Sequence, residues 1–126
     1  MKGFSRPMQV LVAEDNSTNQ LILQQLLEMW GCVPYLASEG EQACELARHQ
    51  NFDLILMDTE MPGVDGLSAT RTIRSFNPQI PIIAVTAHVR PEDRQRCLDA
   101  GMNAHIAKPI DFAILHQLIH RLVPRF

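Results

Sequence analysis

Apolar residues gather in short runs along the chain, separated by segments whose apolar residues recur at helical spacing. Three of the runs are nearly continuous rather than alternating, which is typical of strands covered on both faces of a parallel sheet. A fourth run is weaker, and another contains Pro34, whose missing N–H places that strand at a sheet edge. In chain order, strands are predicted over residues 9–13, 33–37, 53–57, 82–85 and 105–107.

The segments between these runs carry start signals for helices. Ser17 with Gln20, and Ser38 with Glu41, have the spacing of capping boxes, in which two side chains satisfy the first free backbone N–H groups of a helix. The later segments begin with an aspartate cap or with a proline in the first turn. Helices are predicted over 17–30, 38–50, 66–76, 91–100 and 112–122, the last three after Asp65, from Pro91 and after Asp111.

Alternation of five strands with five helices predicts an α/β fold. Right-handed crossovers between parallel strands place helices on both faces of one sheet, which gives a three-layer sandwich. With the second strand at an edge, the flavodoxin-like (βα)5 order 2-1-3-4-5 follows. We expect one domain over residues 8–126, preceded by a flexible segment over 1–7.

Composition supports a single soluble domain and excludes several classes of protein. The 126 residues are 46% hydrophobic and 20% charged, which is not the composition of a disordered chain. A net charge of −3 argues against direct nucleic-acid binding. No run approaches the roughly 18 apolar residues of a membrane span, and no secretory signal precedes Pro7. Three scattered cysteines are typical of buried thiols in a reducing cytoplasm, so a cytoplasmic location is expected.

Polar residues follow four of the predicted strands. Glu14 and Asp15 come after the first strand, Asp58 after the third, Thr86 after the fourth and Lys108 after the fifth. Ligands of open parallel sheets bind at the carboxyl ends of the strands. Three carboxylates, a hydroxyl and an ammonium group are therefore expected to meet at one edge of the sheet.

Clustered carboxylates repel one another unless a cation lies among them. Oxygen ligands of this kind suit Mg²⁺, with Mn²⁺ as an alternative. Beside such an ion Asp58 stays ionised and can act as a nucleophile toward a phosphoryl group. The metal, Lys108 and the Thr86 hydroxyl would then each stabilise one of the three equatorial phosphoryl oxygens.

Each of these residues also has an ordinary structural explanation when it is taken singly. An aspartate after a buried strand, such as Asp15 or Asp58, is commonly a turn or helix cap. Thr86 could bond only to the backbone, and Lys108 could be a solvated loop charge. It is their convergence at one end of the strands that favours a phosphoryl site.

These residues resemble the receiver domains of two-component response regulators, and most closely the receivers of hybrid sensor histidine kinases. The resemblance extends from Met8 to about Val123. The segment 58–66 is similar to the family's phosphoacceptor loop, with Val64 where Met is frequent. The other matching motifs are 12–16 with 19–20, 81–87, 100–102 and 108–110.

The resemblance implies a phosphorelay function for this site. Asp58 would accept a phosphoryl group from a phosphohistidine on a histidine kinase or a histidine phosphotransfer domain. Glu14, Asp15, Asp58 and the backbone carbonyl of Glu60 would hold Mg²⁺, Glu14 through water. Thr86 and Lys108 would bind phosphoryl oxygens, and the Lys108–Pro109 bond would be cis.

The same resemblance implies two kinds of regulatory residue. In the family, the threonine and an aromatic residue three before the lysine normally move together on phosphorylation. They reshape the face that the elements at 91–100, 105–107 and 112–122 would form here. The aromatic position is His105 in this chain, which makes a pH-sensitive output a hypothesis. Glu60 and His88 lie where family members tune autodephosphorylation.

Several functions stay open on sequence alone. The chain could be the receiver of a hybrid sensor histidine kinase, which the motifs favour, or a stand-alone single-domain regulator. An aspartyl-nucleophile phosphohydrolase is less favoured, because Glu60 stands where such enzymes have a second aspartate. A docking-only receiver is disfavoured by the retained site residues, and a flavodoxin-like cofactor binder by the acidic residues after the first strand.

Overall fold

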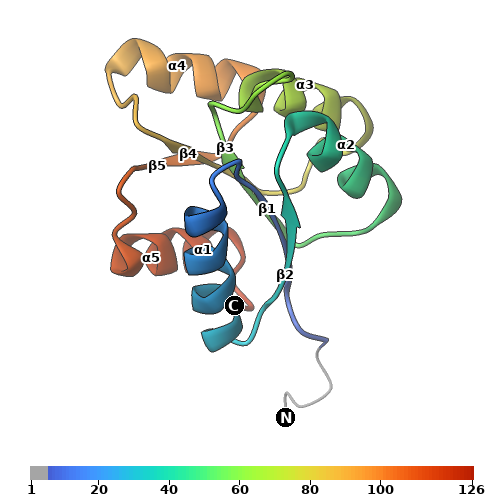
Figure 1. Cartoon of the computed structure of the whole chain (residues 1–126), viewed down its shortest axis with the longest axis vertical. Coiled ribbons are helices and arrows are strands. Elements are labelled where there is room, and N and C mark those ends of the chain that lie inside the picture. Colours follow the sequence, from blue (N-terminus) through green and yellow to red (C-terminus); the bar gives the residue numbers. More distant parts are fainter. Residues whose placement is uncertain (1–5) are drawn as a thin grey trace.

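Five strands and five helices alternate along residues 6–126, the part of the chain that this computed structural model describes (Figure 1). The strands are β1 (Gln9–Ala13), β2 (Val33–Ala37), β3 (Leu54–Asp58), β4 (Ile82–Thr86) and β5 (Ala104–Ala107). The helices are α1 (Ser17–Met29), α2 (Gly40–His49), α3 (Gly66–Phe76), α4 (Pro91–Ala100) and α5 (Phe112–Leu122). Every predicted element is present, with bounds that agree or differ by at most two residues.

All neighbouring strands of the sheet are parallel, in the order β2-β1-β3-β4-β5. Helices α1 and α5 cover one face, and α2, α3 and α4 pack on the other (Figure 1). The predicted flavodoxin-like three-layer sandwich is therefore confirmed. All carboxyl ends of the strands lie at one edge of the sheet, where loops to the next helices begin.

Burial of the central strands explains their continuous apolar sequences. All five residues of β3 and all five of β4 are buried. Along β1, Leu11 belongs to the core under α2 and α3, whereas Val10 and Val12 belong to the core under α1 and α5. Each such side chain contributes about 1.5–3 kcal/mol by leaving water, so both faces of these strands have to be apolar.

Strand β2 lies at the edge, as Pro34 predicts. Within residues 6–126 it pairs only with β1, where Pro34 stands opposite Val10. Val33 is exposed and the next three residues are half-buried, in contrast to the fully buried central strands. A residue without an N–H group is tolerated here because the outer side of the strand has no ladder to form.

The two predicted capping boxes are wrong, although the helices they mark are present. Helix α1 is capped by Asn16, whose side-chain oxygen accepts a hydrogen bond from the Asn19 N–H at 2.9 Å. The Gln20 amide donates instead to the Glu14 carbonyl at 2.5 Å. Asparagine is as good a cap as serine and stands one residue earlier, so Ser17 is already inside the helix.

The cap of α2 differs in the same way. Its N-cap residue is Glu39, which makes no side-chain cap bond. The Ser38 N–H donates to the Gln42 side chain at 2.9 Å, so Ser38 and Glu41 do not form the predicted pair. The caps of α3 by Asp65 and of α5 by Asp111 are confirmed.

Gly66 lets α3 begin directly against the end of β3. A Cβ atom at this position would lie 2.1 Å from the Asp58 carbonyl oxygen and 2.8 Å from the Thr59 Cα. The Gly66 N–H donates to the Thr59 carbonyl at 3.2 Å. Only a residue without a side chain fits this approach, which fixes the loop that follows Asp58.

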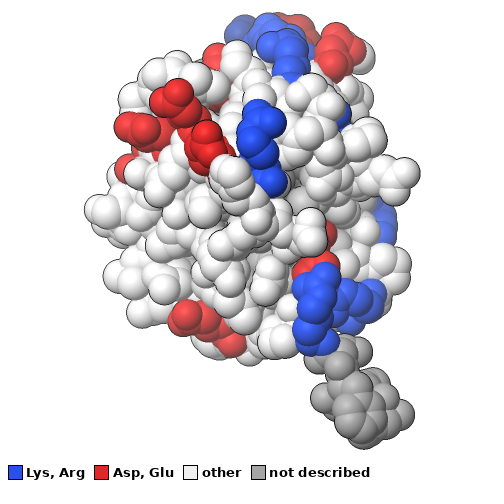
Figure 2. Space-filling model, turned by 90° about the vertical axis from the view of Figure 1, so that its right-hand side faces the viewer, with Lys and Arg blue, Asp and Glu red and all other residues white. Residues whose placement is uncertain are grey.

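Both ends of the described chain meet at the edge of the sheet opposite the carboxyl ends of the strands. Arg6 forms two 3.0 Å hydrogen bonds with Asp53, and Arg125 pairs with the same carboxylate at 3.0 Å. Figure 2 shows a group of blue side chains at the lower right, with red atoms directly above it. The predicted flexible segment 1–7 falls largely on residues 1–5, which lie outside the described residues, and the domain start at Met8 stays a prediction.

The three cysteines are free thiols and all are buried, as predicted. No helix within residues 6–126 is long and apolar enough to cross a membrane.

Candidate functional site

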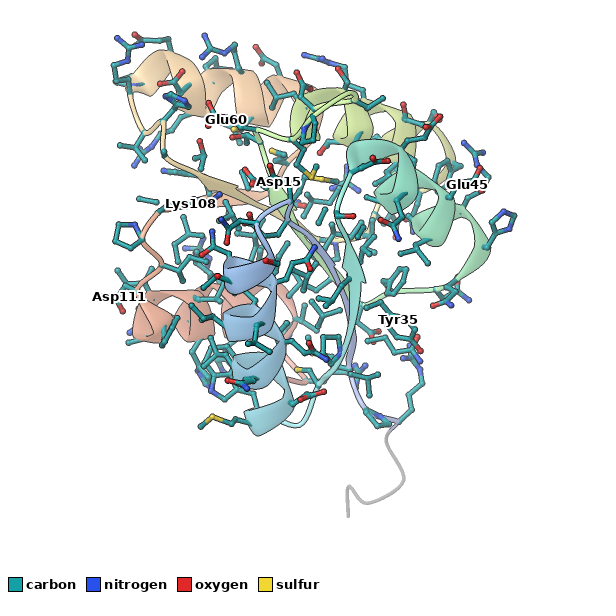
Figure 3. The ribbon with its side chains drawn as sticks, in the orientation of Figure 1. Asp15, Tyr35, Glu45, Glu60, Lys108 and Asp111 are labelled. Carbon is teal, nitrogen blue, oxygen red and sulfur yellow. The ribbon has the colours of Figure 1, made fainter. Side chains whose placement is uncertain are left out.

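The candidate site lies at the carboxyl edge of the sheet, at the ends of four strands. Glu14 and Asp15 follow β1, Asp58 ends β3, Thr86 ends β4 and Lys108 follows β5. Figure 3 shows Asp15, Glu60 and Lys108 around this edge. The convergence expected from the sequence is therefore present in the fold.

Three carboxylates meet at this edge. One oxygen from each of Glu14, Asp15 and Asp58 lies within 4.8 Å of the other two. The side chains of Glu14 and Asp58 are each only 2% exposed, whereas Asp15 is exposed. Negative charges at this separation, two of them poorly hydrated, repel unless a cation compensates them.

Lys108 supplies part of that compensation. Its Nζ lies 3.0 Å from Asp58 Oδ2 and 3.3 Å from Glu14 Oε1. Burial disfavours the charged ammonium group, but the hydrogen bond and charge of Asp58, together with Glu14, outweigh it and raise the pKa of Lys108. The Lys108–Pro109 peptide bond is cis, as predicted.

The carboxylate of Asp58 is held through both oxygens. Oδ1 accepts the Glu60 backbone N–H at 2.9 Å, and Oδ2 accepts from Lys108. Burial, aided by the negative charge of Glu14, raises the pKa of Asp58 to about 6 against the opposing effect of these two donors. The group is therefore mostly ionised at neutral pH, oriented, and poorly hydrated, which suits a nucleophile.

Thr86 lies beside this group at the end of the neighbouring strand. Thr86 is 3% exposed, and its hydroxyl oxygen accepts a hydrogen bond from the His88 N–H at 2.9 Å. The Thr86 carbonyl accepts the Lys108 N–H at 2.9 Å. The hydroxyl is thus bound to its own loop, while the backbone of Thr86 is tied to the segment that carries the lysine.

Glu60 and His88 contact each other through their side chains. The Glu60 carboxylate and Nε2 of His88 lie within hydrogen-bond distance of each other, between the loops after β3 and β4. Both side chains are more than half exposed, at 59% and 53%. The contact joins two loops that border Asp58, and nothing in the sequence predicts it because 28 residues separate its members.

His105 lies apart from the carboxylates, on β5. It stands opposite Ala84 of β4. Two positions further along the same strand pair, Ala107 stands opposite Thr86. Its Nε2 accepts a hydrogen bond from Arg94 Nε at 3.1 Å. Burial and the charge of Arg94 both lower the pKa of His105. The partner Arg94 was not found by sequence reasoning, because the contact joins α4 to β5.

An apolar groove of about 430 Å³ borders the site between α1 and α5. Glu14 and Lys108 lie at its polar end. Ile22 and Phe112 are 42% and 45% exposed. The remaining lining residues are Asn19, Leu23, Pro109 and Ile110.

Comparison with known proteins gives the family of this fold and site. The model of the response regulator receiver domain family matches residues 10–120. Signal transduction histidine-protein kinase BarA of Escherichia coli strain K12 is 40% identical over 119 residues, which cover 93% of this chain and 13% of the kinase. The chain thus spans a small part of this curated relative.

Two solved structures extend the comparison. The receiver domain of sensor histidine kinase PA1611 from Pseudomonas aeruginosa PAO1, with a magnesium ion in its active site cleft, has a TM-score of 0.88 and 40% identity, covering 94% of this chain and 99% of that one. A co-crystal structure of the Saccharomyces cerevisiae phosphotransfer protein Ypd1 with the receiver domain of Ssk1 gives a TM-score of 0.88 and 28% identity, with 94% and 90% coverage. This chain belongs to the response regulator receiver domain family.

Proposed function

We propose that Asp58 of this receiver domain accepts a phosphoryl group from a phosphohistidine on a partner protein. The observation that carries this proposal is the position of Lys108 Nζ, 3.0 Å from Asp58 Oδ2 and 3.3 Å from Glu14 Oε1. A cation held there can stabilise the negatively charged phosphoryl oxygens as the group arrives at Asp58.

The donor set around Asp58 fits Mg²⁺. Carboxylate oxygens of Glu14, Asp15 and Asp58 come within 4.8 Å of one another, and hard oxygen ligands with room for water are what this ion prefers. Asp15, Asp58 and the Glu60 carbonyl would hold it directly, and Glu14 through water; Mn²⁺ would fit the same set. When bound, the ion supplies positive charge to the transferring phosphoryl oxygens.

The chain's own residues carry the transfer as follows. The Asp58 carboxylate attacks phosphorus in line with the bond to the donor histidine. A P–O bond forms, the P–N bond breaks, and the histidine nitrogen keeps the electron pair and takes up a proton. Lys108 then exchanges its bond with Asp58 for one with a phosphoryl oxygen.

Thr86 and His105 would pass this change to the β5 edge of the sheet. To donate to a phosphoryl oxygen, the Thr86 hydroxyl has to give up its own 3.4 Å bond to the His88 carbonyl. Thr86 and His105 lie on strands paired with each other, so a shift at the end of β4 acts on β5 and on the face formed by α4, β5 and α5.

Glu60 and His88 would set the lifetime of the phosphorylated state. Their side-chain contact connects the two loops beside Asp58, where water has to approach for hydrolysis. Loss of either side chain opens this approach or removes a group that orients the water.

We assign the phosphodonor to a histidine kinase or histidine phosphotransfer domain that docks on the apolar groove between α1 and α5. The groove ends at Glu14 and Lys108, so a helix lying in it would bring its histidine next to Asp58. Ypd1 in the Ssk1 complex is a partner of this kind. The similarity to BarA supports a place within a hybrid sensor histidine kinase, and a stand-alone regulator is the alternative.

Intact-mass analysis after incubation with acetyl phosphate and Mg²⁺ tests the proposal. We expect the gain of one phosphoryl group, lost in Asp58→Asn and on treatment with hydroxylamine. Asp99→Asn on exposed α4 is the matched control and should label normally. Steady turnover of phosphoesters without a labelled protein would instead favour a phosphohydrolase, and absence of any reaction would favour a docking module.

A further inference from the structure

Three aromatic rings form a cluster where the end of α1, the middle of α5 and the segment after α5 meet. The rings of Trp30 and His116 lie edge-on, with their centroids 4.9 Å apart. The Phe126 ring lies 4.8 Å from that of His116 and 5.8 Å from that of Trp30. Aromatic rings at such separations attract one another. We call these three residues the aromatic clasp, because Phe126 contacts a residue of each helix at once.

The segment after α5 is fixed independently of the clasp. Arg125 Nη2 lies 3.0 Å from Asp53 Oδ2, just before β3, and Arg125 Nη1 donates to the Arg6 carbonyl at 3.2 Å. The Phe126 N–H donates to the Val123 carbonyl at 2.9 Å. Figure 1 shows the C-terminus beside α1, in agreement with the contact between the Trp30 and Phe126 rings. Backbone and side-chain bonds thus hold the Phe126 ring against the two helices.

The clasp continues the two rows of side chains that form the apolar groove. On α1, Ile22, Leu26 and Trp30 follow at intervals of four, and the Trp30 N–H donates to the Leu26 carbonyl at 3.1 Å. On α5, Phe112 and His116 have the same interval. Residues four apart lie along one side of a helix. Since Ile22 and Phe112 line the groove, each row runs from the groove to the clasp.

Side-chain packing alone connects these two helices. Among the described residues, no hydrogen bond or ion pair joins α1 to α5; their side-chain bonds stay within their own helix ends. Leu27, Leu115 and Ile119 pack in the core beneath them. The core holds the inner sides of the helices, so their spacing on the solvent side depends on the clasp.

We propose that Phe126 is a positioning residue, which with Trp30 and His116 sets the width of the groove between α1 and α5. Without this ring, α5 would shift relative to α1 at the surface, and the distance between Ile22 and Phe112 would change. A protein docked in the groove would then bind less tightly and hold its histidine away from Asp58. The effect on docking rests on the proposed function, whereas the effect on the shape of the groove does not.

The first test is structural. Phe126→Ser removes the ring, and Phe126→Tyr keeps it. Trp30 is the only tryptophan of the chain, so its fluorescence reports the clasp directly. We expect red-shifted emission for Phe126→Ser and parental emission for Phe126→Tyr. In Phe126→Ser, changes of the amide NMR shifts should extend along both helices to Ile22 and Phe112.

The second test separates docking from chemistry. Transfer from the phosphorylated form of the phosphotransfer protein Ypd1 requires docking, and labelling by acetyl phosphate does not. Phe126→Ser should raise the Ypd1 concentration for half-maximal transfer at least fivefold and keep its acetyl phosphate labelling within twofold of the parent. Phe126→Tyr should behave as the parent in both assays. So should the matched control Met29→Ser, at an 80% exposed apolar residue beside Trp30.

Four results would overturn the proposal. They are unchanged amide shifts at Ile22 and Phe112, the same half-maximal Ypd1 concentration for Phe126→Ser and the parent, an equal loss in both assays, or no transfer from Ypd1 to the parent. An equal loss would mean that the ring only stabilises the fold. If acetyl phosphate leaves the parent unlabelled, the proposed function fails, and the amide shifts still decide whether the clasp shapes the groove. If the parent is labelled and those shifts are absent, the clasp fails and the proposed function stands.

Discussion

Lys108 Nζ lies between two buried carboxylates, 3.0 Å from Asp58 Oδ2 and 3.3 Å from Glu14 Oε1. One ammonium group thus faces two groups that are each 2% exposed. A single cation neutralises only part of this charge, and Asp15 adds a third carboxylate. The site therefore keeps a net negative charge that draws in a divalent ion, and the lysine has two acceptors.

Replacement of Lys108 by glutamine should abolish most of the phosphorylation. The change removes the cation that faces Asp58 Oδ2, and loss of one such stabilising donor typically costs about 100-fold or more in rate. It also leaves Glu14 and Asp58 buried without a positive partner. The initial rate of labelling by acetyl phosphate measures the effect. Labelling within twofold of the parent rate would contradict the assigned role, and Arg71→Gln is the control for loss of one positive charge.

Mg²⁺ should stabilise the folded chain, and Asp15→Asn should weaken that effect. An ion that binds only the folded state adds about 1.4 kcal/mol when its concentration is tenfold above Kd. Asp15 is exposed, so its replacement removes one ligand without opening the core. Urea unfolding with and without Mg²⁺ gives both values. An equal gain from Mg²⁺ in parent and variant would remove Asp15 from the ligand set, and Asp99→Asn serves as control.

The sheet could be predicted from the sequence because burial determines the residue pattern of each strand. Continuous apolar residues require helices on both faces of a strand, and Pro34 requires an edge position. Few strand orders other than 2-1-3-4-5 satisfy both requirements. The helix starts were less accurate. Asn16, Ser17 and Ser38 all have cap-forming side chains, and the choice among them depends on contacts with Glu14 and Gln42 that local sequence does not contain.

The site was predictable in its members and less so in its contacts. Glu14, Asp58 and Lys108 could be placed together because parallel strands end at one edge. The bond of Arg94 to His105 and the pair of Glu60 with His88 could not, since each depends on how a loop or helix packs across the sheet. Those contacts form only when the tertiary structure is complete.

Gly66→Ala should destabilise the chain and slow its phosphorylation. The added Cβ would lie 2.1 Å from the Asp58 carbonyl oxygen, so α3 or the end of β3 has to shift. Forced overpacking of this kind costs about 1–3 kcal/mol. Urea unfolding and the labelling rate report the two effects. Ser68→Ala, an exposed change in the same helix, should alter neither; a Gly66→Ala variant with parental stability and rate would show that the close approach is not needed.

Stability should fall with acid through His105, because the folded state binds its proton less readily than the unfolded chain. Burial and the charge of Arg94 lower the folded pKa of His105 below the usual 6.5. The contribution of neutral His105 to the free energy of unfolding is therefore complete above about pH 6.5. It is lost as the pH falls through that value toward the pKa of His105 in the folded state. His105→Gln keeps an acceptor for Arg94 and does not titrate. Between about pH 7.5 and 5.5, the parent should lose more unfolding free energy than this variant, whereas the exposed control His120→Gln should follow the parent. Parallel plots of unfolding free energy against pH for the parent and His105→Gln would show that protonation of this histidine does not weaken its contact with α4. The hypothesis of a pH-sensitive output would then lose its physical basis.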